Sequence, residues 1–419
     1  MTLRNRFTLV IFGIILFLII TPALVLYARG FKIDWQNHKI TKTGAMVIKT
    51  DPSNADVFLN DIKQAGQTPS NIRFLLPGDY DVRIEKDGYQ SWTKRLSVKE
   101  QYVTTINLDR DFISLFLKKP QLAQSWTAGS TSLSNTRDEI VFLNGEQVNV
   151  INTNNGDLTN PGSISGIKLP ALPQVPLIWQ NSKAVFQAIE KRADWGLTDD
   201  QISQITRIET DGAHTSALIG PDLYVLDNTA PLLLEKNVLT FTLENDNIWY
   251  LTGNFLKRFN YSTNQTATIS TTAPIATSGQ IIPAGNQIYA ILNSSLFVLN
   301  DSFEKIYDNA AEAFWNADAK LLTFSNNNEI LTYNPADQKT DLILRSAGQI
   351  KDPVLNWTDG YVFFENEKQV KAVELDGRDH RNIYTIAGLP DDQSSFTVSS
   401  DSRTLYIFNS TQISKYGIQ

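Results

Sequence analysis

The chain has 419 residues, of which 42% are hydrophobic and 19% charged, so it can hold more than one folded domain. Its formal net charge is -7, and no long basic run follows the N-terminal end, so a surface that binds nucleic acid is not expected. It has no cysteine and only three histidines, His38, His214 and His380, which excludes disulfides and thiolate sites and leaves few groups for metal binding or acid–base catalysis.

A charge-free apolar stretch lies near the start of the chain. Residues 7–27, FTLVIFGIILFLIITPALVLY, would form a helix roughly 31 Å long, which matches the hydrocarbon core of a bilayer. Tyr27, Arg29 and Lys32 follow as interfacial aromatic and basic residues. The sequence therefore predicts a signal-anchor, a transmembrane helix over residues 7–27 whose partner is the lipid bilayer.

Two other interpretations of this stretch exist. A cleaved signal peptide is disfavoured, since the run exceeds the usual apolar region of ~7–15 residues and no clear A-x-A site follows. A buried helix of a soluble protein is disfavoured by the length of the run. Residues 1–6 are expected to be a short cytoplasmic tail with Arg4 and Arg6, although Arg29 and Lys32 give a similar positive charge on the other side. The turn-rich body that follows favours an extracytoplasmic C-terminal part of a single-pass cell membrane protein.

The hydrophobic period changes to two over residues 44–110. One alternation points Tyr80, Val82 and Ile84 to one side, and another repeats with Trp92, Leu96 and Val98, with Lys94 and Arg95 between them. Two shorter alternations contain Val57 and Leu59, and Tyr102, Thr104, Ile106 and Leu108. Four or five short antiparallel strands bounded by turn residues predict a compact β-sandwich.

Several turn motifs in this segment occur together and in a fixed order. They are Pro52 with Ala55, Gly66-Gln67-Thr68-Pro69, Pro77-Gly78-Asp79-Tyr80 and Gly88-Tyr89. The segment resembles a PEGA domain, which implies an extracytoplasmic surface module that is often fused to other β-domains and that carries no catalytic residue. The prolines pre-set φ at turns, the glycines suit unusual backbone angles, and Tyr80 and Tyr89 are expected to pack into a small core.

The segment departs from the PEGA pattern at two turns. Asn54 stands where glycine is usual, and Asn60-Asp61 replaces an expected Asp-Gly turn. Because asparagine tolerates the left-handed conformation, both turns are expected to survive.

The rest of the chain, residues 120–419, repeats one pattern of polar turn, strand, short turn, strand and polar loop. Copies start at Asn135, Asn245, Gly285, Asn316, Thr358 and Ser399, and several begin near a tryptophan, at Trp126, Trp179, Trp315 and Trp357. Intervals of 32, 41 and 42 residues separate Asn286, Asp318, Asp359 and Asp401. A period of ~40–45 residues is typical of four-stranded propeller blades.

The fold class is therefore all-β, with a β-propeller of about seven blades after the β-sandwich. The repeat resembles WD-repeat-like and TolB-like propellers in its rhythm. A β-helix and two stacked sandwiches are the structural alternatives. Residues 112–122 are expected to supply a strand that closes the ring beside the last blade.

The sequence contains no nucleophile elbow, phosphate-binding loop or zinc-ligand spacing, so no catalytic, cofactor-binding or metal-binding residue is predicted. Asp376-Gly377-Arg378-Asp379-His380 is the densest polar cluster; it could hold a cation, but a hairpin turn between Val373 and Ile383 is favoured. Asp199-Asp200 is expected to lie in a solvated loop rather than to bind calcium, and Glu190, Lys191 and Arg192 are expected in an exposed loop or at a helix edge.

Trp195, in an insertion at residues 194–204, is the candidate binding residue, although packing is the commoner fate of such a side chain. The predicted function is a membrane-anchored scaffold of the cell envelope, not an enzyme, that binds envelope proteins or surface glycans with its propeller. A propeller-based envelope hydrolase or lyase is the alternative, and a sensor that signals through the helix is a third.

Overall fold

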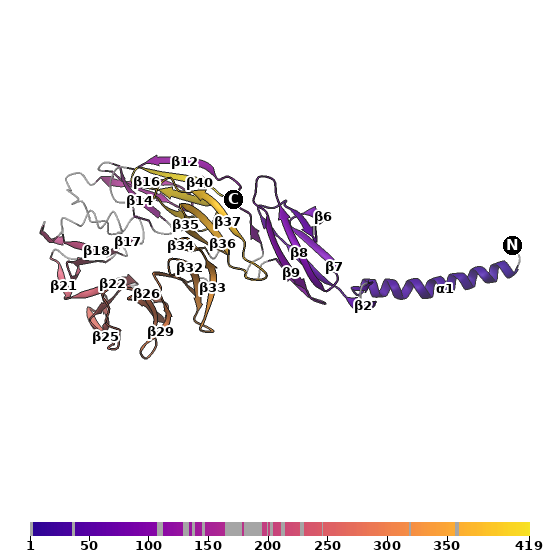
Figure 1. The fold of residues 1–419 in the computed structure, drawn as a ribbon, viewed down its shortest axis with the longest axis horizontal. Coiled ribbons are helices and arrows are strands. Elements are labelled where there is room, and N and C mark those ends of the chain that lie inside the picture. The colour runs from indigo at the N-terminus through magenta and orange to yellow at the C-terminus, as the bar shows by residue number, and fades with distance from the viewer. Residues whose placement is uncertain are drawn as a thin grey trace. The chain divides into compact units, whose positions relative to one another are not determined.

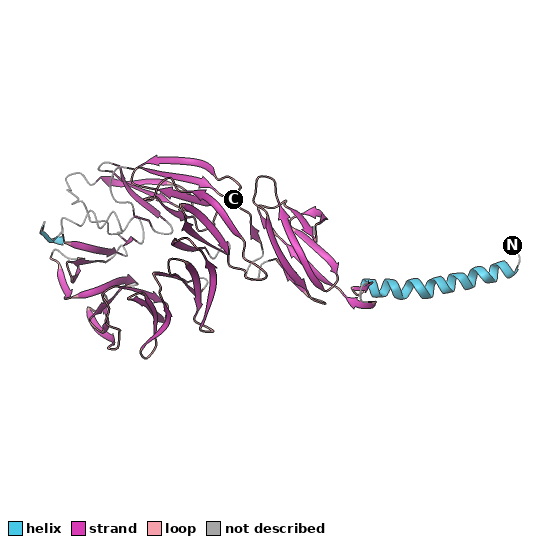
Figure 2. Ribbon diagram, viewed as in Figure 1, coloured by secondary structure: helices cyan, strands magenta, loops and turns pink. Residues whose placement is uncertain are grey.

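The computed structural model describes most of the chain, and every statement below concerns those residues. They are residues 3–35, 38–106, 112–128, 134–135, 139–144, 147–163, 178–179, 195–198, 200–201, 204–210, 214–226, 230–244, 246–317, 320–356 and 360–419. The chain forms two compact units. The first contains Met1–Lys118, Asp376–Asn382 and Gln419, and the second contains Lys119–Leu375 and Ile383–Ile418. Strands dominate both units (Figures 1 and 2), which confirms the all-β fold class.

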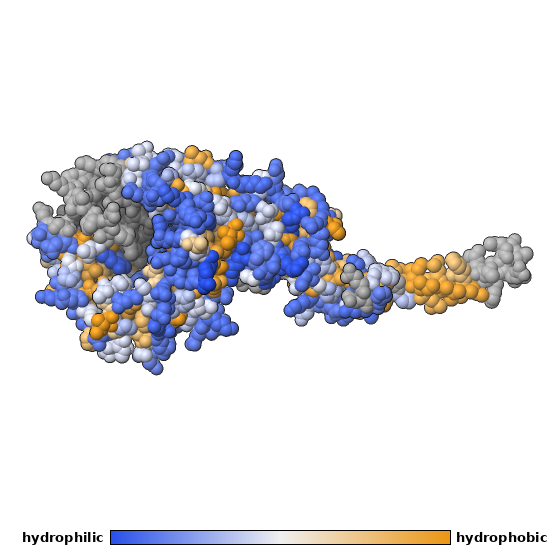
Figure 3. Space-filling view, viewed as in Figure 1, coloured by the Kyte–Doolittle hydropathy of each residue, from blue (hydrophilic) through white to orange (hydrophobic). Residues whose placement is uncertain are grey.

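The first unit begins with one long helix, α1 (Leu3–Ala28), which includes the predicted span. Its stretch Ile11–Ala28 has a mean hydropathy of 2.6 and contains no buried residue, so it is long and apolar enough to cross a membrane. Figure 3 shows a continuous hydrophobic surface along it. The helix ends where Gly30, with φ of 80°, donates its N–H to the carbonyl of Tyr27, a left-handed glycine cap.

A short antiparallel hairpin follows the helix at once, and the sequence pattern did not predict it. It consists of β1 (Phe31–Asp34) and β2 (Lys39–Lys42).

A small β-sandwich comes next, as predicted. One sheet has the order β10-β3-β7, a second has the order β6-β5-β8-β9, and β11 pairs with β4. The strands are β3 (Gly44–Ile48), β4 (Thr50–Asp51), β5 (Asp56–Leu59), β6 (Ile62–Gln67), β7 (Ser70–Leu75), β8 (Gly78–Glu85), β9 (Trp92–Val98), β10 (Val103–Thr105) and β11 (Ile113–Ser114). The expectation of purely antiparallel strands was wrong, because β10 pairs with β3 and β11 with β4 in parallel. After β9 the chain crosses to the other sheet, so no hairpin forces the direction to reverse.

The core of the sandwich follows the predicted alternation with three corrections. Val57, Leu59, Val82, Ile84, Trp92, Leu96 and Val98 are buried, as expected. Lys94 is buried with them instead of lying outside, since it has the same parity on β9 as Trp92 and Leu96. Tyr102 is exposed, and Tyr80 and Tyr89 are only half-buried, so the core is built on Trp92, Phe116 and aliphatic side chains.

The turns of the sandwich have the backbone conformations that the sequence predicts. Asn54 has φ of 63°, and Asn60 and Asp61 have φ of 48° and 63°, so all three occupy the left-handed region. Asn54 and Asp61 therefore adopt the left-handed conformation that is usual for the glycines they replace.

Gly44 of β3 packs so closely against the chain after β9 that a larger residue does not fit. A Cβ atom there would lie 2.4 Å from the carbonyl oxygen of Lys99 and 2.6 Å from Cγ1 of Val98. Gly44→Ala is therefore expected to cost about 1–3 kcal/mol of stability by overpacking. Gly388→Ala is the matched control, since nothing lies within 4 Å of the Cβ it adds. Thermal unfolding of both variants measures the difference, and equal melting temperatures would contradict the expectation.

The second unit contains, in its described residues, seven sheets that follow one another along the chain, in agreement with a propeller of about seven blades. Its first sheet comprises β13 (Ser134–Asn135), β14 (Glu139–Asn144), β15 (Gln147–Asn152) and β16 (Leu158–Ser163). Its second comprises β17 (Ile178–Trp179), β18 (Ile205–Thr210), β19 (Thr215–Ile219), β20 (Asp222–Val225) and β21 (Leu232–Glu235), with β17 parallel to β18.

The next four sheets are regular antiparallel meanders of four strands. The third comprises β22 (Val238–Glu244), β23 (Asn247–Thr252), β24 (Phe255–Asn260) and β25 (Gln265–Ser270). The fourth comprises β26 (Gly279–Ala284), β27 (Gln287–Leu292), β28 (Ser295–Leu299) and β29 (Phe303–Asp308). The fifth comprises β30 (Glu312–Asn316), β31 (Leu321–Ser325), β32 (Glu329–Asn334) and β33 (Lys339–Arg345). The sixth comprises β34 (Ile350–Asn356), β35 (Tyr361–Asn366), β36 (Gln369–Glu374) and β37 (Ile383–Gly388).

The seventh sheet joins the two ends of the unit. β12 (Gln121–Thr127) pairs with β40 (Gln412–Gly417), which continues through β39 (Thr404–Phe408) to β38 (Ser395–Val398). A closing strand was predicted, but its position was wrong in part: it begins at Gln121, and Ile113–Ser114 pairs with β4 of the first unit. Neighbouring sheets share apolar clusters, as when Ile140 and Phe142 pack with Tyr406 and Ile413. Each sheet thus buries a face that it could not bury alone.

Candidate functional site

The polar loop Asp376–Asn382 is the most densely bonded of the clusters that the sequence singles out. It joins β36 to β37, and Val373 pairs with Ile383, so it is the hairpin turn that the sequence favours. The Asp376 carboxylate accepts a hydrogen bond from the backbone N–H of Arg378 at 2.9 Å, which closes the turn locally. The loop belongs to the first unit, although the two strands that it joins belong to the second.

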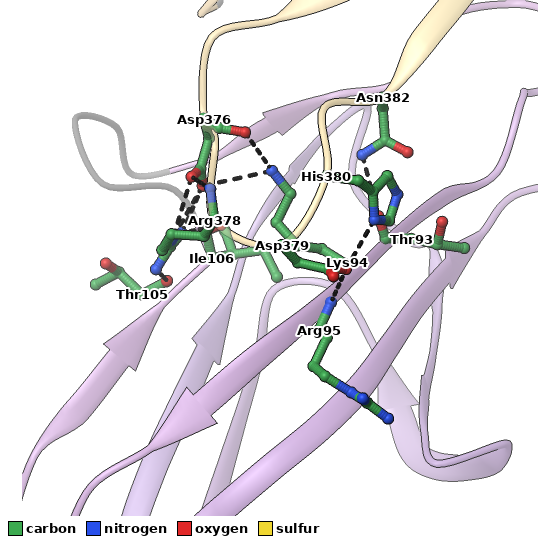
Figure 4. A network of polar contacts seen from close by, with 10 residues as sticks. All are labelled: Thr93, Lys94, Arg95, Thr105, Ile106, Asp376, Arg378, Asp379, His380 and Asn382. Atoms are coloured by element: carbon green, nitrogen blue, oxygen red, sulfur yellow. Dashed lines mark hydrogen bonds and ion pairs between the residues drawn. The ribbon is translucent and has the colours of Figure 1, made fainter.

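Asp376 and Arg378 form a bidentate ion pair inside this loop. The Arg378 guanidinium donates from Nε to Oδ1 of Asp376 at 3.1 Å and to Oδ2 at 3.0 Å. Its Nη2 donates to Oδ2 at 2.7 Å. The same guanidinium donates to the carbonyls of Thr105 and Ile106 at 3.2 and 2.8 Å (Figure 4). One arginine therefore connects the loop to the end of β10.

Lys94 completes the cluster from the buried face of β9. Its side chain is 0% exposed, and its ammonium donates to the main-chain carbonyl of Asp376 at 2.7 Å and lies 3.7 Å from the carboxylate. The face of Trp92 is 5.8 Å from the same nitrogen. The side chain of Asp376 is only 2% exposed and that of Arg378 is 27% exposed, so a lysine, an aspartate and an arginine form one charge triad in which the lysine and the carboxylate are buried.

The pKa of Asp376 reflects two opposing effects. Burial raises the pKa of the carboxyl, but the hydrogen bonds from Arg378 and the charge of Lys94 outweigh burial, so the pKa lies below its ordinary value. The carboxylate therefore stays ionised and is held by cations of this chain.

The other end of the loop is held against β9 by hydrogen bonds of Asp379 and Asn382, and His380 pairs with Asp379. Asp379 accepts the backbone N–H of Arg95 at 3.0 Å and pairs with His380 at 2.7 Å, and both contacts lower the pKa of Asp379. Asn382 donates to the carbonyl of Thr93 at 3.1 Å (Figure 4). We call this arrangement the clasp and define it as Lys94, Asp376, Arg378, Asp379 and Asn382. Its hydrogen bonds and ion pairs hold the backbone of the loop against β9 and the end of β10.

Sequence reasoning found the loop of the clasp but missed Lys94. The signal was present, because Lys94 falls two residues from both Trp92 and Leu96 and so shares their face of β9. Its partner lies 282 residues further along the chain, and no local pattern indicates that pairing.

The other predicted site residues do not gather around the clasp. Trp195 is 4% exposed and therefore buried; residues 180–194 lie outside the described residues, and a binding role for Trp195 stays a prediction. Asp200 accepts a hydrogen bond from Gln204 at 2.9 Å. Glu190, Lys191, Arg192 and Asp199 also lie outside the described residues.

The histidines offer no shared site. His214 stacks on Tyr261 at 3.8 Å between ring centroids and lies 3.4 Å from Asp246, in the second unit, whereas His38 and His380 belong to the first. Within the described part of the chain, no three histidine, aspartate or glutamate residues form a group that could hold a metal ion.

Glu209 in β18 is a second buried acid that sequence reasoning did not single out. Burial raises its pKa, although the pair with Arg207 and the backbone N–H of Leu243, 2.6 Å away, act in the opposite direction. Arg207 also lies over the ring of Phe241 at 5.2 Å. These contacts join β18 to β22, so this acid serves the packing between two successive sheets.

Comparison with known proteins identifies one domain. Residues 43–111 match the PEGA domain family, so the chain contains a PEGA domain, as its turn motifs predict. A comparison with curated proteins found no match to the chain.

Among solved structures, a chain of the mitotic checkpoint complex is 10% identical with a TM-score of 0.44, and the alignment covers 71% of this chain and 91% of that one. The extracellular domain of the proposed one component system BT4673 from B. thetaiotaomicron is 13% identical with a TM-score of 0.40. That alignment covers 72% of this chain and 39% of the other, so less than half of the longer protein is matched.

Proposed function

We propose that the chain is a single-pass membrane protein that presents its β-propeller outside the cytoplasm as a binding scaffold. The observation that carries the proposal is the stretch Ile11–Ala28, none of whose residues is buried by the rest of the structure. Folded proteins rarely leave so large an apolar surface in water, whereas a bilayer covers it fully. The PEGA domain that follows is of an extracellular type, which supports an extracytoplasmic body.

The structure supports binding rather than catalysis as the proposed role of the body. A propeller displays many loops on a rigid ring, and such loops suit recognition of proteins or glycans of the cell envelope. The charged clusters described above are satisfied by partners within the chain: Asp376 is held by Arg378 and Lys94, and Glu209 by Arg207 and a backbone N–H. Groups held in this way are poor candidates for proton transfer to a substrate.

Removal of the helix tests the anchor. The full chain is expected to float with membranes and to resist extraction by salt and alkaline carbonate, whereas a variant that lacks Leu3–Ala28 should remain in the soluble fraction. Intact mass of the membrane-bound protein separates an anchor from a cleaved signal peptide. A mature protein that has lost the helix and is released from membranes would overturn the proposal.

Orientation and binding need their own measurements. A protease added to intact cells should digest the body of the full chain without lysis. The helix-less variant, immobilised, should retain specific envelope proteins or glycans that a blank matrix does not. Protection of the body until the cells are lysed would contradict the extracytoplasmic placement.

A further inference from the structure

The hairpin β1–β2 has two faces of different chemistry. Phe31 lies opposite Lys42 and Ile33 opposite Ile40, so these four side chains share one face, and Trp35 continues it beyond β1. Lys32 lies opposite Thr41 and Asp34 opposite Lys39 on the second face.

On the second face Asp34 and Thr41 are buried, whereas the side chains of Lys32 and Lys39 are exposed, and on the first, open face the isoleucines are exposed. Asp34 and Thr41 are 7% and 5% exposed, and the Thr41 hydroxyl bonds to Glu100. In contrast, Ile33, Ile40 and Trp35 are 47%, 57% and 77% exposed. Three large apolar side chains in one small hairpin therefore remain largely exposed.

Several contacts hold the hairpin beside the end of the helix. The carbonyl of Gly30 accepts both the N–H and the hydroxyl of Thr43 at 2.8 Å. The Tyr27 ring stacks on Phe74 with 4.9 Å between centroids, and Lys32 donates to the Phe74 carbonyl at 3.4 Å. The open face and the helix end line one groove of about 870 Å³, whose other wall is residues 76–80 of the sandwich; Leu26, Tyr27, Ile33, Trp35 and Ile40 are among its lining residues.

The charge around the open face is opposite to that of the whole chain. Arg29, Lys32, Lys39 and Lys42 are the four basic residues of the hairpin strands and the helix end, against two acidic residues, Asp34 of the strands and Asp79 of the groove, whereas the chain as a whole carries -7. Exposed aromatic and apolar side chains combined with basic ones are the composition of surfaces that lie among lipid headgroups. Basic clusters next to a membrane helix select anionic lipids.

We propose that the open face, defined as Tyr27, Ile33, Trp35 and Ile40 with Arg29 and Lys39 beside it, lies in the headgroup region of the bilayer and binds anionic phospholipid. The inference rests on the proposed membrane anchor and adds a second, lipid-selective contact to it. Tyr27 and Trp35 sit at the depth of the headgroups, the isoleucines reach the first part of the acyl chains, and the basic side chains pair with lipid phosphates.

Site-directed spin labels test this placement in the full chain. The chain contains no cysteine, so Ile33→Cys gives a single attachment site, and Ile40→Cys is a second variant on the same face. Ile62→Cys is the matched control, because Ile62 is a strand residue of the first unit and is 68% exposed. Each labelled protein is placed in vesicles of phosphatidylcholine with phosphatidylglycerol, and relaxation by oxygen is compared with relaxation by a water-soluble nickel chelate.

The labels at positions 33 and 40 are expected to respond more to oxygen than to nickel, and the label at position 62 is expected to do the reverse. Equal nickel access at positions 33 and 62 would overturn the proposal. Shielding of position 33 from both reagents would also overturn it, because that result indicates a protein covering the face. Vesicle flotation of the same samples tests the membrane anchor separately. If the protein floats with the vesicles but its label is exposed to water, only the placement of the open face is overturned.

Lipid selectivity is tested by the charge of the vesicle. The oxygen-to-nickel ratio at position 33 should rise when phosphatidylglycerol replaces part of the phosphatidylcholine, and the rise should disappear in a variant with Arg29→Gln and Lys39→Gln. A ratio that does not depend on lipid charge would overturn the anionic-lipid part of the proposal.

Discussion

Asp376→Ala is expected to destabilise the first unit by about 3–5 kcal/mol, because it removes the only carboxylate of the charge triad and leaves the buried charge of Lys94 in the interior. The main-chain carbonyl of residue 376 still accepts the ammonium, but it carries no compensating charge. Hydrogen–deuterium exchange in the full chain measures the effect, since amides of β8 and β9 should lose protection. A loss below about 1 kcal/mol would contradict the structure of the clasp.

A second substitution separates the charge from the packing. Lys94→Met in the Asp376→Ala background removes the buried ammonium and keeps an unbranched apolar side chain against Trp92. The double variant should therefore recover most of the stability that Asp376→Ala loses. If the two substitutions add without coupling, the triad does not act as a unit.

The pH dependence of the same variants follows from the lowered pKa of Asp376. A carboxyl with a folded-state pKa below its ordinary value of 3.8 contributes stability that is fully present above that value. This contribution is lost as the pH falls through the folded-state pKa. On acidification below about pH 4, the wild-type first unit should thus lose more stability than the double variant, which has no carboxyl there.

Trp92→Ala is expected to cost about 3–5 kcal/mol, because the indole is 0% exposed and its removal leaves a large cavity in a small core. The sandwich has few other large side chains to fill the space, so the cost should lie toward the upper end of that range. Trp35→Ala is the matched control. Trp35 is 77% exposed, and its removal should change stability by no more than about 0.5 kcal/mol in detergent.

Urea unfolding followed by circular dichroism measures both tryptophan variants. A Trp35→Ala protein as unstable as Trp92→Ala would mean that the hairpin tip belongs to the core of the first unit. A Trp92→Ala protein with wild-type stability would mean that the buried face of β9 is assigned wrongly.

Local signals in the sequence determined most of the elements of this protein. The helix follows from an unbroken apolar run, and the left-handed turns at Asn54 and Asn60-Asp61 follow from the backbone tolerance of those residues. The sheets of the second unit follow from a repeated pattern of strand and turn. Helix length, turn geometry and side-chain alternation depend on neighbours within a few residues, so each is visible in the sequence.

Only the tertiary structure decided which distant segments meet. The pairing of Lys94 with Asp376 spans 282 residues, and Ser125 of β12 lies opposite Ser414 of β40, 289 residues further on. The tertiary structure likewise decided the parallel pairing of β10 with β3 and the exposure of the open face of the β1–β2 hairpin. Such contacts depend on how whole sheets stack and close, because a single strand has the same alternation of side chains whichever element packs against it. Lys94 is a core residue because another segment covers its face of β9, and Trp35 is exposed because no described segment covers it.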